Sequence, residues 1–202
     1  MRCCRLVDDK IGVLALQGNV SEHIDAFRLA LIRMGQGGSS EVFEVRHSAE
    51  LVGCTALAIP GGESTTISRL IDKNHMYEPI RSFSGGIFAT CAGMVLMATH
   101  VDDPRIHTLG LIELKVDRNA FGRQRESFEA DLPIQGLEGG PFHAIFIRAP
   151  VATFTGAGVI VLSRMDQGIV AVEYGKHMAL SFHPELSCDT RLHERFLKNL
   201  GI

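Results

Sequence analysis

The chain has 202 residues, 46% of them hydrophobic, which is enough to bury the core of one domain. A formal net charge of −3 excludes a general electrostatic attraction to nucleic acid or to anionic membranes, and no apolar run approaches the roughly 20 residues of a membrane-spanning helix. We therefore expect a cytoplasmic protein with residues 10–202 in a single domain, an N-terminal extension of unknown role at residues 1–9, and a small molecule or another protein as ligand.

The first half of the chain alternates strands with helices. Residues 11–16 are continuously apolar and end at Gln17, a pattern typical of a buried parallel strand. Apolar residues with helical spacing follow and stop near Gly35. Three further strands are expected at residues 42–45, 56–59 and 86–90.

The second half has a different pattern. Strand-like runs joined by short turns occur at residues 109–116, 143–148, 159–162 and 169–182. The last of these contains a hairpin signal around Gly175. A final helix carries Leu192, Phe196 and Leu197, with Thr190 as its expected N-cap.

This order of elements predicts a flavodoxin-like α/β fold. Strands that alternate with helices at short spacing favour a mainly parallel central sheet with helices on both faces. The runs in the second half predict an antiparallel extension of that sheet.

One apolar segment, residues 86–97, carries the strongest chemical signal. It reads as a strand, a tight turn and a helix, with Cys91 at the turn. We expect a thiol on such an elbow to point toward solvent, where the N–H groups at the helix start favour its negative form. Ala89 stands where such a turn usually has glycine, so we expect either a negative φ at Ala89 or a neighbour that leaves room for its methyl group.

A base for this nucleophile is available near the end of the chain. His183 is followed two residues later by Glu185, which can hold the imidazole if the segment is extended, because residues i and i+2 then point the same way. Cys91, His183 and Glu185 form a candidate catalytic triad.

Three loops should converge at the carboxyl edge of the sheet: residues 17–19, the turn at Pro60–Glu63, and Cys91. Gly61 and Gly62 allow the backbone to approach a ligand closely, so their N–H groups could face an oxyanion together with that of Ala92. The alternative is that this glycine pair only reverses the chain direction.

The five cysteines are odd in number and have no C-x-x-C spacing, which argues against a disulfide framework and against a structural zinc site. The other eight histidines also lack metal-site spacing. We predict no metal and no cofactor.

Seven segments together resemble a known family. They are residues 12–18, 60–66, 90–93, 118–124, 127–130, 146–150 and 182–185. The chain resembles the class I (triad) glutamine amidotransferases, and more closely the glutaminase subunits of pyridoxal phosphate synthases, from about Lys10 to its end. The resemblance implies that Cys91 is the nucleophile, His183 the base and Glu185 its orienting partner.

The resemblance also implies a glutamine pocket and a partner. The pocket would be lined by Gly61, Gly62, Glu63, Arg118, Ile147 and Arg148, with the N–H groups of Gly62 and Ala92 as the oxyanion hole. The implied reaction is hydrolysis of L-glutamine to L-glutamate and ammonia through a cysteine thioester. The ammonia would pass to a separate (β/α)₈-barrel synthase subunit, bound through residues 17–23 in a large hetero-oligomer, for vitamin B6 biosynthesis.

Other functions stay open from the sequence. The nearest is the glutaminase subunit of another class I amidotransferase. A cysteine peptidase or a redox-sensing protein could use a similar elbow, although a redox sensor would not need His183 and Glu185. A non-catalytic subunit that only regulates its synthase is the remaining alternative.

Overall fold

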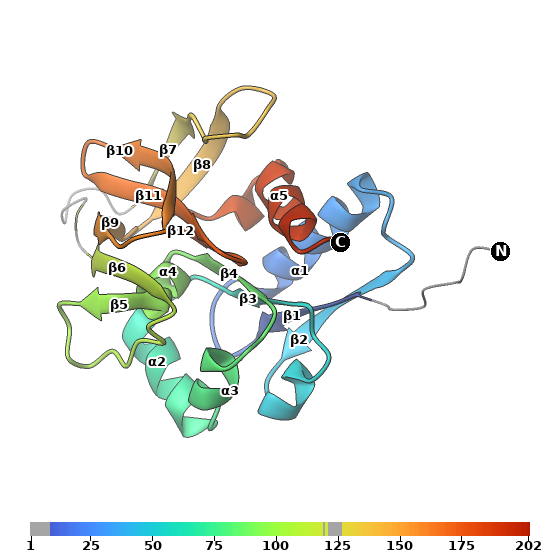
Figure 1. Cartoon of the computed structure of the whole chain (residues 1–202), viewed down its shortest axis with the longest axis horizontal. Coiled ribbons are helices and arrows are strands. Elements are labelled where there is room, and N and C mark those ends of the chain that lie inside the picture. Colours follow the sequence, from blue (N-terminus) through green and yellow to red (C-terminus); the bar gives the residue numbers. More distant parts are fainter. Residues whose placement is uncertain (1–8, 119, 121–126) are drawn as a thin grey trace.

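The computed structural model describes residues 9–118, 120 and 127–202 (Figure 1). Most of the expected extension, residues 1–8, lies outside the described residues, as does most of the 118–124 segment. Asp9, which the sequence analysis assigned to the extension, is the first residue of strand β1 and accepts a hydrogen bond from the Thr55 hydroxyl at 3.2 Å. Among the described residues, no helix is both long and apolar enough to cross a membrane.

The first half of the chain builds the parallel part of the sheet. Its strands pair in the order β2-β1-β3-β4, all parallel, and β12 joins β4 in the same direction. This is the start of the flavodoxin-like order, so the predicted fold is confirmed. The strands are β1 (Asp9–Leu14), β2 (Ser40–Val45), β3 (Ala56–Ile59), β4 (Gly86–Thr90) and β12 (His177–Leu180).

The second half extends the sheet, mostly with antiparallel pairs, as predicted. β11 pairs antiparallel with β9, β10 and β12, and β6 with β9, while β5 and β6 run parallel. β7 and β8 form a separate antiparallel pair. The bounds are β5 (Ala98–Val101), β6 (Ile112–Asp117), β7 (Ser127–Leu132), β8 (Phe142–Ile147), β9 (Val151–Thr155), β10 (Ile160–Met165) and β11 (Gly168–Tyr174).

Helices cover both faces of the parallel part (Figure 1). α1 and α5 pack together on one face, while α2 and α3 lie on the other. The alternation of β3 explains the two layers, because Ala56 and Ala58 join the core beneath α1 and α5, whereas Leu57 and Ile59 join the core beneath α2 to α4. The helices are α1 (Val20–Arg33), α2 (Ser64–Lys73), α3 (Tyr77–Arg81), α4 (Ala92–Met97) and α5 (Arg191–Asn199).

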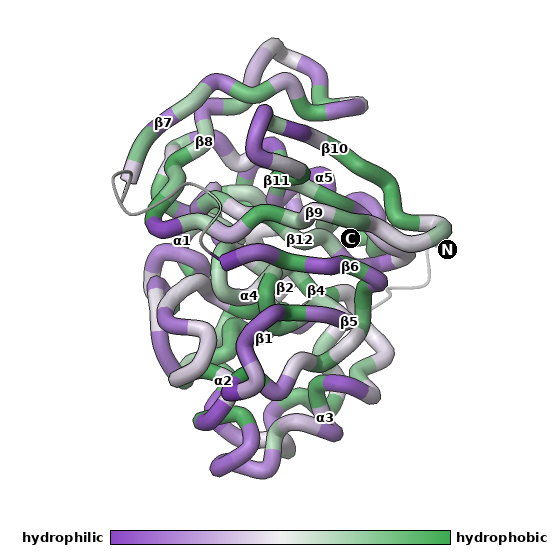
Figure 2. The backbone as a smooth tube through the Cα atoms, turned by 90° about the vertical axis from the view of Figure 1, so that its left-hand side faces the viewer, coloured by the Kyte–Doolittle hydropathy of each residue, from purple (hydrophilic) through white to green (hydrophobic). Residues whose placement is uncertain are grey.

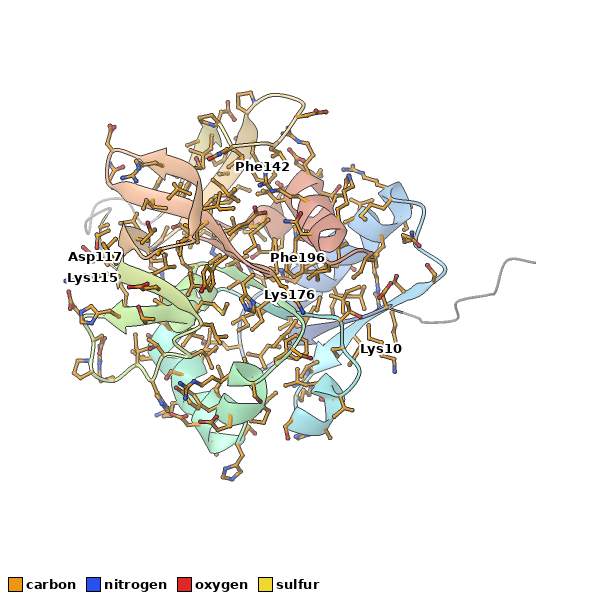
Figure 3. The ribbon with its side chains drawn as sticks, in the orientation of Figure 1. Lys10, Lys115, Asp117, Phe142, Lys176 and Phe196 are labelled. Atoms are coloured by element: carbon orange, nitrogen blue, oxygen red, sulfur yellow. The ribbon has the colours of Figure 1, made fainter. Side chains whose placement is uncertain are left out.

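Aromatic side chains fill the core beneath α5. Phe196 of α5 lies between that helix and the sheet (Figure 3), and its ring packs 5.2 Å from that of Phe88 on β4. Phe142 of β8 is fully buried, with the guanidinium of Arg191 over its ring. Strand β6, between β9 and the edge strand β5, instead alternates buried and exposed residues, which appear as green and purple bands in Figure 2. The contact between Phe142 and Arg191 anchors the β7–β8 pair to α5 through β8.

Two local predictions differ from the structure in detail. The first strand ends at Leu14, because Ala15 and Leu16 already turn, although the Ala15 N–H still donates to the Val45 carbonyl at 2.8 Å. Thr190 is the N-cap residue of α5, as predicted, but its side chain makes no capping hydrogen bond to the helix. Its hydroxyl donates to Glu194 and accepts from Arg33 instead, both at 2.7 Å.

Candidate active site

Cys91 lies on a strained elbow between β4 and α4. Its φ of 50° and ψ of −107° are in a region that non-glycine residues rarely adopt, at a cost of about 1–3 kcal/mol. Ala89 is not among the positive-φ residues, as predicted, because the strain falls on Cys91 itself. Glycine is required at position 93, where a Cβ would lie 2.4 Å from the Ile59 carbonyl oxygen. The close packing of α4 against β3 thus supports the elbow.

The Cys91 thiol faces a cavity and not open solvent, so the prediction of a solvent-pointing thiol is wrong. Cys91 is only 5% exposed. The end of β8 covers it, and the Ile147 carbonyl oxygen lies 3.6 Å from Cys91 Sγ. The next residue, Arg148, has a φ of 44°, a second strained non-glycine residue beside the same sulfur.

His183 and Glu185 follow β12 and bond to each other. His183 Nδ1 lies 2.7 Å from Glu185 Oε1, and the His183 N–H donates to the Ile145 carbonyl at 2.8 Å. The segment is not extended as expected, because Pro184–Leu186 form a short 3₁₀ helix. The tight turn nevertheless directs both side chains into the same buried space.

The electrostatics of this pair favour its ionised form. Burial by itself lowers the pKa of His183, but contacts with Cys91 and Glu185 outweigh burial and raise that pKa to about 10. Burial raises the pKa of Glu185, but His23 and His183 lower it to about 2. An imidazolium therefore lies beside the Cys91 sulfur, the environment in which cysteine nucleophiles react as thiolates.

The turn after β3 packs directly against this group. A Cβ at Gly61 would lie 2.4 Å from His183 Cε1 and 3.1 Å from Cys91 Cβ, so only glycine fits there. The Gly61 N–H donates to the Thr90 hydroxyl at 3.1 Å. Gly62 has a φ of 144°, which also requires glycine. The Gly61 N–H is therefore already bonded, which leaves Gly62 as the candidate oxyanion donor of this turn.

Glu63 and Arg118 form the charged side of the cavity. Glu63 accepts hydrogen bonds from the N–H and hydroxyl groups of Thr65 and Thr66 at 2.5–3.3 Å and thereby caps α2. Burial by itself raises the pKa of Glu63, but these bonds together outweigh burial and lower that pKa to about 2. Arg118 donates to Glu63 Oε1 at 3.3 Å and also to Asp103. Glu63 is thus a fixed anion.

The predicted site residues come together at one cavity of ≈ 350 Å³, within the size range of small-ligand sites. Glu185 lies behind His183 and does not reach the cavity wall. Such a space can hold a small ligand with charges of both signs next to a thiol. The predicted residues that line it are Gly61, Gly62, Glu63, Cys91, Ala92, Arg118, Ile147, Arg148 and His183.

The sequence analysis missed several residues around the triad. Asn19 donates to Glu185 Oε1 at 3.3 Å, and Gln17 accepts from the Glu63 N–H at 3.2 Å. Both lie in a loop that the strand pattern had placed at this edge, so a signal existed. His23 and Asp103 had none, because His23 lies within α1 and Asp103 follows β5, a strand that the sequence pattern did not predict. Within the described part of the chain, no group of three or more metal-ligating side chains is arranged to hold a metal ion.

Comparison with known proteins agrees with the class that this fold and site define, the class I glutamine amidotransferases. The SNO glutamine amidotransferase family matches residues 13–201. The chain belongs to that family.

Three similar proteins span nearly the whole chain. The pyridoxal 5'-phosphate synthase subunit PdxT of Methanoregula boonei is 70% identical over 193 residues, which cover 96% of this chain and all of that protein. PdxT of Methanosphaerula palustris is 65% identical over 196 residues, covering 97% of this chain and all of that protein. A crystal structure described as a glutamine amidotransferase superposes with a TM-score of 0.83 at 46% identity, over 95% of this chain and 99% of that one.

Proposed function

We propose that this chain is the glutaminase subunit of a pyridoxal 5'-phosphate synthase. It hydrolyses L-glutamine to L-glutamate and ammonia and passes the ammonia to a synthase subunit. The observation that carries the proposal is the buried His183–Glu185 pair, 2.7 Å apart, beside Cys91 in a cavity with charges of both signs. The printed names of the relatives support the choice of synthase.

The residues support acyl transfer in two steps. The Cys91 thiolate attacks the side-chain carbonyl carbon of glutamine, and the C–N bond breaks as His183 gives its proton to the leaving ammonia. A glutamyl thioester remains on Cys91. Water then attacks the thioester while His183 takes a proton from it, which releases glutamate and restores the thiolate.

The tetrahedral intermediates need donors for their oxyanion. We assign this role to the N–H groups of Gly62 and Ala92, both of which line the cavity. The Gly61 N–H is already bonded to Thr90, which supports Gly62 as the donor from the glycine turn. Each such donor is worth about 3 kcal/mol of transition-state stabilisation.

The charged residues suit the two charges of an amino acid. Glu63 is the anion that binds the ammonium group of the substrate. Arg118, which also pairs with Asp103, donates to Glu63 and holds its carboxylate in place. Arg148, exposed at the cavity, is the cation for the α-carboxylate. Gly61 and the backbone of Ile147 would close the pocket around the side-chain amide.

The partner we propose is a (β/α)₈-barrel synthase subunit in a large hetero-oligomer, in the cytoplasm, with residues 17–23 of this chain at the contact. No cofactor is needed for the glutaminase step, and residues 10–202 act as one domain. In support, Gln17 and Asn19 of this segment bond to Glu63 and Glu185. A protein bound to the segment would therefore affect the position of both site residues.

The test is glutamate release from L-glutamine by the purified chain, alone and with the synthase subunit, using Cys91→Ala as the blank. We expect activity that rises with the synthase subunit and is lost in the variant. Absence of activity from a folded chain with a competent synthase would overturn the proposal and favour another amidotransferase partner or a regulatory role.

A further inference from the structure

A fully buried histidine on α1 contacts the back of the triad. His23 Nε2 lies 3.1 Å from the Thr90 hydroxyl oxygen and 3.5 Å from Glu185 Oε2. Glu185 Oε2 has no hydrogen-bond partner within the ranges that the structure describes. His23 Nε2 is therefore the group placed to satisfy that carboxylate oxygen.

The surroundings of His23 decide which nitrogen carries the proton. An ionised carboxylate only accepts hydrogen bonds, so Nε2 must carry a hydrogen to face Glu185. His23 Nδ1 has no partner in the described part of the chain, and the ring packs against those of Phe88 and His193. A hydrogen at Nδ1 would have no acceptor in this apolar space and would leave Glu185 Oε2 without a donor.

The same N–H also reaches the glycine turn. Thr90 immediately precedes Cys91, and its hydroxyl oxygen accepts the Gly61 N–H at 3.1 Å as well as facing His23 Nε2. One imidazole N–H thus stands between the acid of the triad and the turn that carries the oxyanion donor. Burial lowers the pKa of His23, with Glu185 opposing, so the ring is a neutral donor.

We propose that His23 is a positioning residue that fixes Glu185 and the Thr90–Gly61 contact with a single N–H. It touches neither glutamine nor the sulfur and acts through these two neighbours. The kinetic part of this inference depends on the proposed glutaminase activity, whereas the geometric part concerns only the triad.

His193 offers a matched control in the same cluster. It is also fully buried, on α5, with its ring 6.5 Å from that of His23. Neither of its ring nitrogens has a hydrogen-bond partner among the described residues. Replacing His193 therefore removes a buried imidazole from the same aromatic cluster without removing a contact to Glu185 or Thr90.

The first experiment follows alkylation of Cys91 by iodoacetamide in the full chain, read by mass spectrometry of the peptide that contains Cys91. We expect His23→Met to slow this alkylation about tenfold, the factor of one lost buried hydrogen bond. His193→Met should stay close to wild type. Equal rates for His23→Met and His193→Met would overturn the proposal, and this result would not depend on whether glutamine is the substrate.

A second pair of variants separates positioning from folding. The amide N–H of Gln reaches about as far as Nε2 of histidine, whereas that of Asn reaches only about as far as Nδ1. We expect His23→Gln to restore alkylation and, in the complex with the synthase subunit, kcat for glutamine, while His23→Asn lowers kcat with little change in KM. If the two variants behave alike, the N–H at Nε2 is not what matters. If wild type alkylates normally but hydrolyses no glutamine, only the proposed function fails.

Discussion

His183 Nδ1 lies 2.7 Å from Glu185 Oε1, and the two side chains are 5% and 0% exposed. A carboxylate buried this fully has a large desolvation cost, which the bond to the imidazolium offsets. The pair therefore fixes both the orientation of the ring and its protonation toward Cys91.

Glu185→Gln should lower kcat by about 10²–10⁴, because the amide keeps the shape but lacks the negative charge that stabilises the imidazolium of His183 and orients its ring. The measurement is steady-state glutamate release in the complex. The exposed Glu78→Gln on α3 is the matched control and should leave kcat unchanged. A Glu185→Gln enzyme with wild-type kcat would contradict the triad.

Stability should depend on pH through the same pair. The raised pKa of His183 gives stabilisation that is complete below pH 6.5 and is lost as pH rises toward about 10. The lowered pKa of Glu185 gives stabilisation that is complete above pH 4.5 and is lost as pH falls toward about 2. The difference in free energy of unfolding between wild type and Glu185→Gln should therefore be largest between pH 4.5 and 6.5. Denaturant unfolding measures it, and a difference that grew toward pH 10 would refute the ion pair.

Gly61→Ala should abolish most activity. The added Cβ would lie 2.4 Å from His183 Cε1, so the ring must move, and a displacement of about 1 Å can cost about 10²-fold in rate. Gly38→Ala is the control, because nothing lies within 4 Å of a Cβ there and its φ is not positive. The measurement is glutamate release by the two variants. Similar activities would mean that the turn at Gly61 can accommodate a Cβ without displacing His183.

Arg148→Gln should raise KM for glutamine more than it lowers kcat, because it removes a cation that holds the substrate before and during reaction. A lost charge-assisted hydrogen bond of about 1.5–3 kcal/mol corresponds to about 10–100-fold in kcat/KM. Arg164→Gln, on β10, is the control. Substrate-saturation curves give both constants, and an unchanged KM would exclude Arg148 from substrate binding.

The parallel half of the fold could be predicted from the sequence because most of its strands, such as β3 and β4, are buried on both faces and form continuous apolar runs. β7 was missed because its residues are mostly half-buried or exposed, so it lacks such a run. β5 was missed because it begins directly after α4 and because Thr99 and His100, two of its four residues, are polar and exposed. In both cases the strand forms because it pairs with a distant strand, and the local sequence pattern carries no information about that pairing.

The site, like the fold, contains some residues that the sequence pattern marks and others that only the folded structure shows. Cys91 and His183 stand at strand ends with small or acidic neighbours, so local patterns mark them. The contact between Asn19 and Glu185 joins residues 166 positions apart, and only the folded sheet brings them together. His23 lies at the start of the buried face of α1, where a buried histidine has no pattern of its own.

The most direct test of the account is covalent labelling with a glutamine analogue that carries a diazoketone in place of the side-chain amide. We predict one label per chain, on Cys91, in parallel with loss of glutaminase activity and slowed by L-glutamine. Inactivation with the label on another residue, or labelling of Cys91 that glutamine does not slow, would contradict it.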